Sequence, residues 1–390
     1  MLVTKRPAGP SRRTAPIVGR VAEFFAGIGL VRLALERQNW RVVFANDIDP
    51  DKAEMYRHNW PTDDHLHVGD IHHLSADRIP ACDLFTASFP CNDLSIAGKW
   101  EGLNGKESSA FWGLIRIIRE LGERRPPVVM LENVVGFLMS RDGQDFETAL
   151  LALNELGYAV DAIILNAAHW VPQSRARLFV IANRMTNEDA NPFAEESGVR
   201  PASLVTFINL HQNIQWNIRV LPDLPKRKAV LPDIIEDLPD DDPHWWSRDR
   251  VEYFMGQLSP RHLVQAKVMI NQETHQYCTA FRRVRNGRSM AELRSDGIAG
   301  CLRTPRGGSG RQILFKAGKG KHQVRLLTAR ECARLQGVPN SYKIKVPLNQ
   351  ALFGFGDAVC VPAIEWIAKH YLKTIMREVA GEPFLYREIA

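Results

Sequence analysis

The chain has 390 residues, is 45% hydrophobic and 24% charged, and carries a formal net charge of +6. These are the proportions of an ordinary globular protein long enough for two domains. Its six cysteines show no C-x-x-C spacing, which argues against a metal site or a disulfide framework and for a reducing compartment. The basic N-terminus lacks the apolar stretch of a secretory signal, and no apolar run predicts a membrane span. We therefore expect a cytoplasmic protein that holds no metal ion.

The first half of the chain alternates short apolar runs with amphipathic stretches. Several of the runs are apolar throughout, as expected of strands buried on both faces. Strand–helix alternation predicts an α/β fold with a Rossmann-like, doubly wound, mostly parallel sheet, whose ligands gather at the carboxyl ends of the strands. The predicted strands are 21–26, 41–47, 83–89, 128–134, 159–165 and 177–183, and the predicted helices are 31–38, 109–122 and 145–157.

Beyond residue 184 the pattern changes. From 185 to about 323 there is little clear periodicity and much Pro, Gly, Asp and Arg. Residues 244–345 contain 20 Lys and Arg against 6 Asp and Glu, a net charge of +14 that leaves −8 for the rest of the chain. A basic segment on a slightly acidic body is typical of a polyanion-binding domain attached to a catalytic domain, although a Lys/Arg-rich solvated surface is the alternative. Helical periodicity returns at 327–337 and 359–376.

A glycine-containing turn follows the first predicted strand. In FFAGIGL (24–30), Gly27 and Gly29 allow a tight turn and a close approach of the backbone to a ligand at a helix N-terminus. Asp47 ends the second predicted strand, where its carboxylate can accept hydrogen bonds from ribose hydroxyls, and Asp70 could accept from the amine of an adenine ring. Either aspartate taken singly also fits a helix N-cap. Their position and order together favour a nucleoside site.

A cysteine follows a proline just after the third predicted strand. Cys91, in ASFPCNDLSIAG (87–98), is expected at the carboxyl edge of the sheet, where its thiol can reach a substrate. The next strand ends near Glu132, and Arg175 and Arg177 begin the last predicted strand, pointing to one side. A free cysteine alone is more commonly an inert core residue. The combination of thiol, carboxyl and guanidinium groups instead predicts a catalytic centre.

The region from about 21 to 376 resembles the bacterial DNA (cytosine-5) methyltransferases, because eight motifs occur in that family's order and spacing. The resemblance implies the S-adenosylmethionine-dependent methyltransferase fold, S-adenosyl-L-methionine as cofactor and duplex DNA as substrate. The motifs are FAGIG (25–29), NDID (46–49), GDI (69–71), SFPCNDLS (88–95), LENV (131–134), QSRAR (173–177), LTARECARLQGVP (327–339) and GFGDAVCVP (354–362).

The resemblance also implies a reaction. Cys91 is expected to add to carbon 6 of a flipped-out cytosine and make carbon 5 nucleophilic, with Glu132 contacting ring nitrogen 3 and the exocyclic amine. Arg177 is expected to hold the carbonyl oxygen of the base and to favour the thiolate, and Arg175 to contact a phosphate or the nucleophile loop. The expected cofactor-binding residues are Phe25, Gly27, Ile28, Gly29, Asp47, Ile48, Asp70, Ile71, Pro90, Asp357, Ala358 and Val359.

Four positions depart from the family pattern. Asn92 stands where Gln is most common, which bears on recognition more than on chemistry. Leu30 stands where Gly is frequent, and Trp170 directly precedes Val171, where a Gly commonly intervenes. Asp357 stands where Asn is usual, which implies a changed hydrogen bond near the cofactor. None of these departures removes a reacting group, so an active enzyme is expected.

The resemblance divides the chain into four segments. A basic flexible tail (1–20) precedes a catalytic, cofactor-binding domain (21–184), and a smaller, irregular target-recognition domain (185–345) is followed by a C-terminal segment (346–390) that returns to the catalytic domain. Arginines of the recognition segment are expected to contact phosphates, which position a protein without reading sequence. For each arginine, an ordinary surface charge is the alternative. The candidate DNA contacts are Asn92, Ser95, Arg283, Arg285, Arg306 and Arg311.

Other functions fit parts of the pattern. A related family methylates cytosine in transfer RNA with a similar order of motifs, although the long basic insert favours duplex DNA. An inactive methyltransferase core kept for DNA binding would not need Cys91, Glu132, Arg175 and Arg177 together, and a dehydrogenase would not need the Pro-Cys loop. The biological role expected is protection of host DNA in restriction–modification or phage defence, beside a cognate defence protein. A monomer is expected, because one active site modifies one strand at a time.

Overall fold

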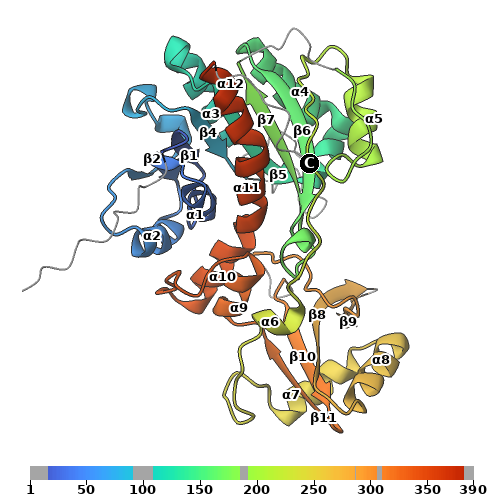
Figure 1. Cartoon of the computed structure of the whole chain (residues 1–390). Coiled ribbons are helices and arrows are strands. Elements are labelled where there is room, and N and C mark those ends of the chain that lie inside the picture. The colour runs from blue at the N-terminus through green and yellow to red at the C-terminus, as the bar shows by residue number, and fades with distance from the viewer. Residues whose placement is uncertain (1–15, 91–108, 185–191, 286, 305–309, 382–390) are drawn as a thin grey trace, which may run out of the picture.

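The larger part of the protein is built on a seven-stranded sheet. The computed structural model describes residues 16–90, 109–184, 192–285, 287–304 and 310–381. The strand order is β3-β2-β1-β4-β5-β7-β6, with β7 antiparallel to both its neighbours and the other pairs parallel (Figure 1). This confirms the predicted α/β, doubly wound, mostly parallel fold. The strands are β1 (Arg20–Phe24), β2 (Arg41–Asp47), β3 (Leu66–Val68), β4 (Leu84–Ala87), β5 (Val128–Val134), β6 (Ala159–Asn166) and β7 (Ala176–Asn183).

Helices cover both faces of this sheet because alternate strand residues supply two separate cores. In β5, Val128 and Met130 belong to one core while Val129 and Leu131 belong to the other, as the two-residue repeat of a strand requires. The first core packs against α1 (Leu30–Arg37) and the C-terminal helices, and the second against α3 (Ala110–Leu121), α4 (Gln144–Glu155) and α5 (Ala202–Leu210). Helix α2 (Pro50–Asn59) follows β2, and short 3-10 segments are η1 (Ile71–His73), η2 (Ala76–Arg78), η4 (Gly122–Arg124), η5 (Val135–Gly143) and η6 (Ala167–His169).

The smaller part contains a four-stranded antiparallel sheet in the order β11-β10-β8-β9. Its strands are β8 (Gln276–Arg285), β9 (Arg288–Leu293), β10 (Ile313–Gly318) and β11 (Lys321–Leu326). Helices α7 (Arg248–Gly256) and α8 (Pro260–Ile270) bury Phe254 and Ala266 against this sheet, and α6 (Leu231–Ile234) precedes them. Sequence periodicity gave no sign of this sheet, because β8 combines small apolar residues with a run of arginines.

The C-terminal helices return to the larger part, where α11 (Val361–Ile367) packs on α1 (Figure 1). They are preceded by α9 (Ala329–Leu335) and α10 (Leu348–Asp357) and continue through a π-helical segment, Ala368–Leu372, into α12 (Lys373–Val379). The stretch Leu348–Val379 has the length and apolar composition that a membrane span requires, but 72% of its most apolar window is buried inside the protein. Such burial is typical of a core helix.

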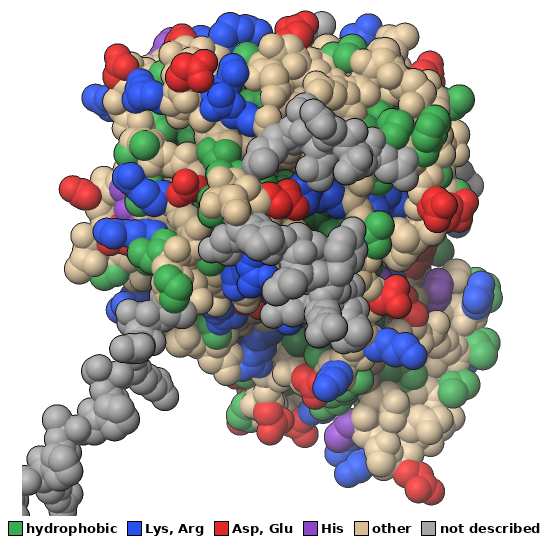
Figure 2. Space-filling view, turned by 45° about the horizontal axis from the view of Figure 1, so that its top comes forward, with side chains coloured by type: hydrophobic (Ala, Val, Ile, Leu, Met, Phe, Trp, Pro, Cys, Tyr) green, Lys and Arg blue, Asp and Glu red, His purple; other side chains and the backbone are tan. Residues whose placement is uncertain are grey.

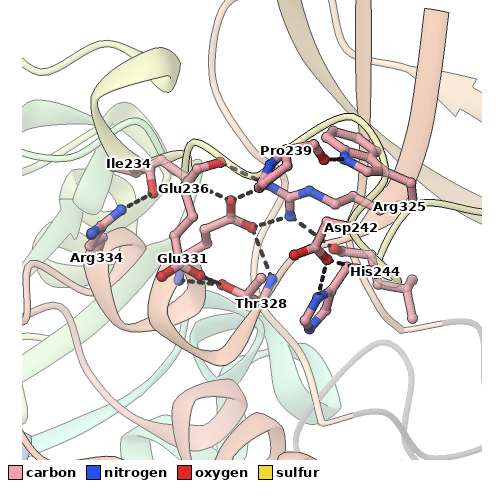
Figure 3. Close-up of polar contacts among 11 residues, drawn as sticks. Ile234, Glu236, Pro239, Asp242, His244, Arg325, Thr328, Glu331 and Arg334 are labelled. Carbon is pink, nitrogen blue, oxygen red and sulfur yellow. Dashed lines mark hydrogen bonds and ion pairs between the residues drawn. The ribbon is translucent and has the colours of Figure 1, made fainter.

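One buried ion pair ties the two parts together. Arg325 at the end of β11 and Glu331 on α9 both have side chains that are 0% exposed, and two nitrogens of Arg325 donate to the two Glu331 oxygens at 2.5 and 2.7 Å. Glu331 also accepts hydrogen bonds from the backbone N–H groups of Thr328 and Glu236 (Figure 3). The segment that enters the smaller part and the segment that leaves it are therefore held by the same carboxylate.

Candidate cofactor and catalytic site

The turn between β1 and α1 has three left-handed residues. Phe25, Gly27 and Gly29 have φ values of 56°, 55° and 81°. A Cβ on Gly29 would lie 2.5 Å from the ring of Trp60, so only glycine fits there. At Gly27, by contrast, a Cβ would meet nothing nearer than the Phe25 carbonyl oxygen at 4.0 Å. The surface of the turn at Gly27 is therefore open to a ligand.

Asp47 fastens this turn to the end of β2. Its side chain is buried, and its two carboxylate oxygens accept from the N–H groups of Gly27 at 2.7 Å and Asp49 at 2.8 Å. Burial raises the pKa of Asp47, while Lys52 and the two N–H groups oppose that rise. Because a carboxylate has about four acceptor positions, Asp47 can hold the turn and still accept from a ligand. The adjacent Ile48 side chain is 64% exposed, which leaves an apolar surface beside the carboxylate.

The remaining N-terminal candidates lie along the same edge of the sheet. Asp70 accepts from the His72 N–H at 2.9 Å and so caps η1, which is the N-cap geometry considered in the sequence analysis. Ile71 is buried against Gly113 of α3. Pro90 is half-buried at the last described position before Cys91. Cys91, Asn92, Ser95 and Arg306 lie outside the described residues.

Glu132 and Arg177 meet at the carboxyl end of β5. The Arg177 Nε lies 3.0 Å from a Glu132 carboxylate oxygen, and both side chains are largely buried. The antiparallel pairing of β5 with β7 aligns Val134 with Arg177, which brings the start of β7 to the end of β5. Next to Glu132, the Asn133 side chain donates to the Phe89 carbonyl at 3.2 Å. This bond ties the pair to the segment that leads into Cys91.

Arg175 is placed differently from the sequence-based expectation. Its side chain is buried, and its terminal nitrogens donate to the carbonyls of Leu302 at 2.9 Å, Gly356 at 3.1 Å and Ala358 at 2.5 Å. Burial lowers the pKa of Arg175, and repulsion from Arg177 adds to that effect. A guanidinium enclosed in this way holds backbone segments together, a role that the sequence did not indicate, while the expected contact with the loop at Cys91 concerns residues outside the described part of the chain.

Two further polar groups near Arg175 were missed. Gln173 is completely buried; its side chain accepts from the Leu302 N–H at 2.9 Å and donates to the Leu335 carbonyl at 2.8 Å. Arg175 also donates to the Cys301 thiol at 3.3 Å. Burial of Cys301 is outweighed by Arg175 and Arg177, which lower the pKa of this thiol below its usual value. The two-residue spacing of Gln173 and Arg175 was the available signal for a joint structural role.

The C-terminal candidates lie against the turn between β1 and α1. A Cβ on Gly354 would come within 2.7 Å of the Ile28 side chain, and the Tyr342 hydroxyl donates to the Ile28 carbonyl at 2.5 Å. Val359 is buried, Ala358 is half-buried and Asp357 is exposed. Helix α10 and the turn are therefore parts of one packed unit.

Comparison with known proteins identifies the family. The sequence model of the C-5 cytosine-specific DNA methylases matches residues 19–373. The chain belongs to the C-5 cytosine-specific DNA methylase family. The chain is similar to the Type II methyltransferase M.HhaI of Haemophilus parahaemolyticus, at 30% identity over 90% of this chain and 93% of that protein. It is also similar to M.MspI of Moraxella sp, at 26% identity over 93% and 73% of the two chains.

Solved structures share the fold of this DNA methylase. The S. pombe Dnmt2 methyltransferase superposes with a TM-score of 0.59 at 20% identity, covering 93% of this chain and 99% of that one. The Entamoeba histolytica methyltransferase EhMeth superposes with a TM-score of 0.57 at 16% identity, covering 94% of this chain and 99% of that one. Together with the family match, this identifies the chain as a DNA (cytosine-5) methyltransferase with the α/β methyltransferase fold.

Of the candidate DNA contacts of this methylase, the structure describes Arg283, Arg285 and Arg311. Arg283 on β8 lies 3.9 Å from Glu292 and is more than half exposed, while Arg311 donates to the Asn349 side chain. Arg285 ends β8, opposite Arg288 of β9. On the face shown in Figure 2, Lys and Arg side chains are interspersed with Asp and Glu side chains.

Proposed function

We propose that this methyltransferase uses S-adenosyl-L-methionine to methylate carbon 5 of a flipped-out cytosine in a specific duplex sequence, with Cys91 as nucleophile. The observation that carries the proposal is the 3.0 Å contact between Arg177 and Glu132, at the edge of the sheet where the chain leads into Cys91. A thiol, a carboxyl group and a guanidinium are the groups needed to bind and activate a cytosine ring.

The residues of the turn after β1 and of the end of β2 fit the proposed cofactor. Gly27 leaves the turn open, Asp47 offers acceptor positions for ribose hydroxyls, and the exposed Ile48 side chain offers an apolar surface for a purine ring. When bound, S-adenosyl-L-methionine supplies an electrophilic methyl group on a sulfonium. We assign Phe25, Ile28, Gly29, Asp70, Ile71, Pro90 and residues 357–359 to the same site.

The chain's own residues perform the activation. The Cys91 thiolate forms a bond to carbon 6, and the electron pair of the ring double bond moves to carbon 5. Glu132 hydrogen-bonds ring nitrogen 3 and the exocyclic amine, and Arg177 binds the carbonyl oxygen, so that both stabilise the charge that develops on the ring. After methylation, a base removes the carbon-5 proton, the double bond re-forms and the Cys91 thiolate leaves. Arg175 acts as a positioning residue in this scheme.

Membership of the family supports the proposed substrate and role. Carbon 5 is reached only when the base leaves the duplex, so base flipping is part of the proposal. We propose a catalytic domain of residues 21–184 and 346–390 and target recognition within 185–345, carried by the smaller part, since α5 (Ala202–Leu210) packs into the core of the larger part. We place the enzyme in the cytoplasm as a monomer. Its relatives are Type II methyltransferases, which supports protection of host DNA within a restriction–modification or phage-defence system, beside a cognate defence protein.

The test uses wild-type protein and Cys91→Ala with radiolabelled S-adenosyl-L-methionine and, in separate reactions, mixed-sequence duplex DNA or transfer RNA. Label in 5-methylcytosine with wild type alone is expected. Label in transfer RNA instead of DNA would replace the proposed substrate, and label transferred equally by Cys91→Ala would overturn the mechanism. If the protein binds DNA but transfers no methyl group to any of several unrelated duplexes, the chain would be an inactive methyltransferase core that serves in DNA binding.

A further inference from the structure

The side chain of Asp357, a departure from the usual family residue, has a specific partner. The Lys52 ammonium lies 2.7 Å from its carboxylate. Lys52 is in the first turn of α2, directly after the strand that ends in Asp47, and Asp357 is the last residue of α10. The side chains are 20% and 48% exposed, so the pair is at the rim of the structure and accessible to salt. It connects two segments that are distant in the chain.

Lys52 lies in the field of several carboxylates. Burial alone would lower the pKa of Lys52, but Asp357, Asp47 and Asp49 outweigh burial and raise it. The ammonium is therefore charged at neutral pH. Because Asp47 is the acid that fastens the cofactor turn, Lys52 is electrostatically coupled both to that acid and to Asp357. The ion pair thus stands beside the group proposed to accept from the cofactor ribose.

The main chain around Asp357 is also held by hydrogen bonds from buried side chains. Arg175 donates to the carbonyls of Gly356 and Ala358, the residues on either side of Asp357. Gly354, one turn earlier, packs directly on Ile28 of the cofactor turn. Residues 356–359 are therefore attached beside the turn by Arg175 and Gln336 on the backbone and by Lys52 on the Asp357 side chain. Arg175 is buried, whereas the Lys52 attachment is the one open to solvent.

We propose that the Lys52–Asp357 ion pair is a clasp that holds residues 356–359 beside the cofactor turn and thereby strengthens cofactor binding. The proposal rests on the proposed function, in which this turn binds S-adenosyl-L-methionine. Lys52 and Asp357 are positioning residues. A partly exposed ion pair changes an equilibrium constant by at most about fivefold, and salt weakens it. The clasp is therefore expected to change the Kd of the cofactor by no more than this factor, and the effect is expected to decrease as salt is added.

The experiment measures S-adenosyl-L-methionine and S-adenosylhomocysteine binding by calorimetry at low and high salt. The variants are Lys52→Gln, Asp357→Asn and the double variant. Each single change is expected to raise the Kd about three- to fivefold, and the double variant to bind no more weakly than either single one. The salt dependence of Kd is expected to diminish in all three. In steady-state assays, the loss is expected in KM for the cofactor more than in kcat.

A second ion pair provides the matched control. Arg37 on α1 lies 3.0 Å from Glu365 on α11, with side chains 39% and 25% exposed, and it likewise joins the N-terminal half to the C-terminal helices. Arg37→Gln is expected to change the thermal midpoint by as much as Lys52→Gln does, without changing cofactor Kd. This comparison separates a cofactor effect from a general effect on stability.

Two results would overturn the clasp. One is an unchanged Kd in both single variants, and the other is a double variant whose loss equals the two single losses combined, which would show that the residues act independently. Wild-type protein that binds neither S-adenosyl-L-methionine nor S-adenosylhomocysteine would contradict the proposed function instead. The two failures are therefore distinguishable in the same titrations.

Discussion

The Arg177 guanidinium lies 3.0 Å from the Glu132 carboxylate because β7 is inserted antiparallel beside β5. In an antiparallel pair, the start of one strand meets the end of the other, so an arginine at the beginning of β7 reaches the carboxyl edge of the sheet. A parallel neighbour would present the end of its own strand at that edge. The reversed strand therefore supplies the cation of the Arg177–Glu132 pair.

Glu132→Gln is expected to slow methyl transfer by about a hundredfold or more, because the amide can neither share a proton with the cytosine ring nor balance its charge. Single-turnover transfer of label to DNA measures the effect, with cofactor affinity expected to stay at the wild-type value. Glu123→Gln is the control, since Glu123 forms an ion pair with Arg184 on the surface. Equal rates for the Glu132 and Glu123 variants would remove Glu132 from the mechanism.

Arg175→Lys is expected to destabilise the fold by about 2 kcal/mol or more, because one ammonium cannot reproduce the hydrogen bonds of a buried guanidinium to separate carbonyls. Arg177→Lys, at a less buried position, is expected to lose turnover with little loss of stability. Urea unfolding and kcat distinguish the two variants. The assignment of Arg175 to positioning fails if its variant unfolds like wild type and loses only turnover.

Arg325→Met is expected to cost about 3–5 kcal/mol of folding free energy, since it leaves the Glu331 carboxylate buried without its cation. Arg248→Met is the exposed control, because the Arg248–Glu252 pair lies on the surface, and a change within about 0.5 kcal/mol is expected. Denaturant unfolding of both variants measures the difference. Similar losses for the two would mean that burial does not decide the strength of the Arg325 pair.

Glu23→Gln is expected to remove a pH dependence of stability. Glu23 is 1% exposed in β1, and burial raises its pKa from 4.5 to about 8. The folded protein binds the Glu23 proton more tightly than the unfolded chain does. The protonated Glu23 side chain therefore stabilises the fold fully below the pKa of the unfolded chain, and this contribution is lost as the pH rises through the pKa of the folded protein. Urea unfolding at several pH values between the two pKa values measures the effect. The free energy of unfolding of the variant is expected to increase relative to that of wild type as the pH rises. The prediction would be contradicted if the free energy of unfolding depended on pH equally in the variant and in wild type.

The sheet of the larger part was predictable because its strands are buried on both faces and read as uninterrupted apolar runs. Strands β2 and β5 match the predicted runs 41–47 and 128–134 at both ends. Strand β3 was missed because it has only three residues, two of them half-buried. The sheet of the smaller part was missed because strands such as β8 carry charged residues among small apolar ones, which obscures a two-residue repeat.

The candidate site was predictable only where a motif specifies an interaction with the chain's own backbone or with a neighbour along one strand. Gly27 and Asp47 could be paired from their motifs, and the structure joins them through a hydrogen bond. The enclosure of Arg175 by Leu302 and Ala358 could not be predicted, because it depends on how distant segments pack. The same holds for Lys52 and Asp357, whose separation in sequence gives no sign of contact.

The Arg325–Glu331 pair restricts how the smaller part can be exchanged between relatives. The chain leaves the larger part near Glu236 and returns near Arg325, and both points contact the Glu331 carboxylate. A transplanted insert joined between Arg325 and Glu331 would combine a foreign strand end with the host's acid. Without an arginine at the equivalent position, the chimaera would enclose an uncompensated negative charge at its junction. Viable grafts must therefore take both partners from one parent.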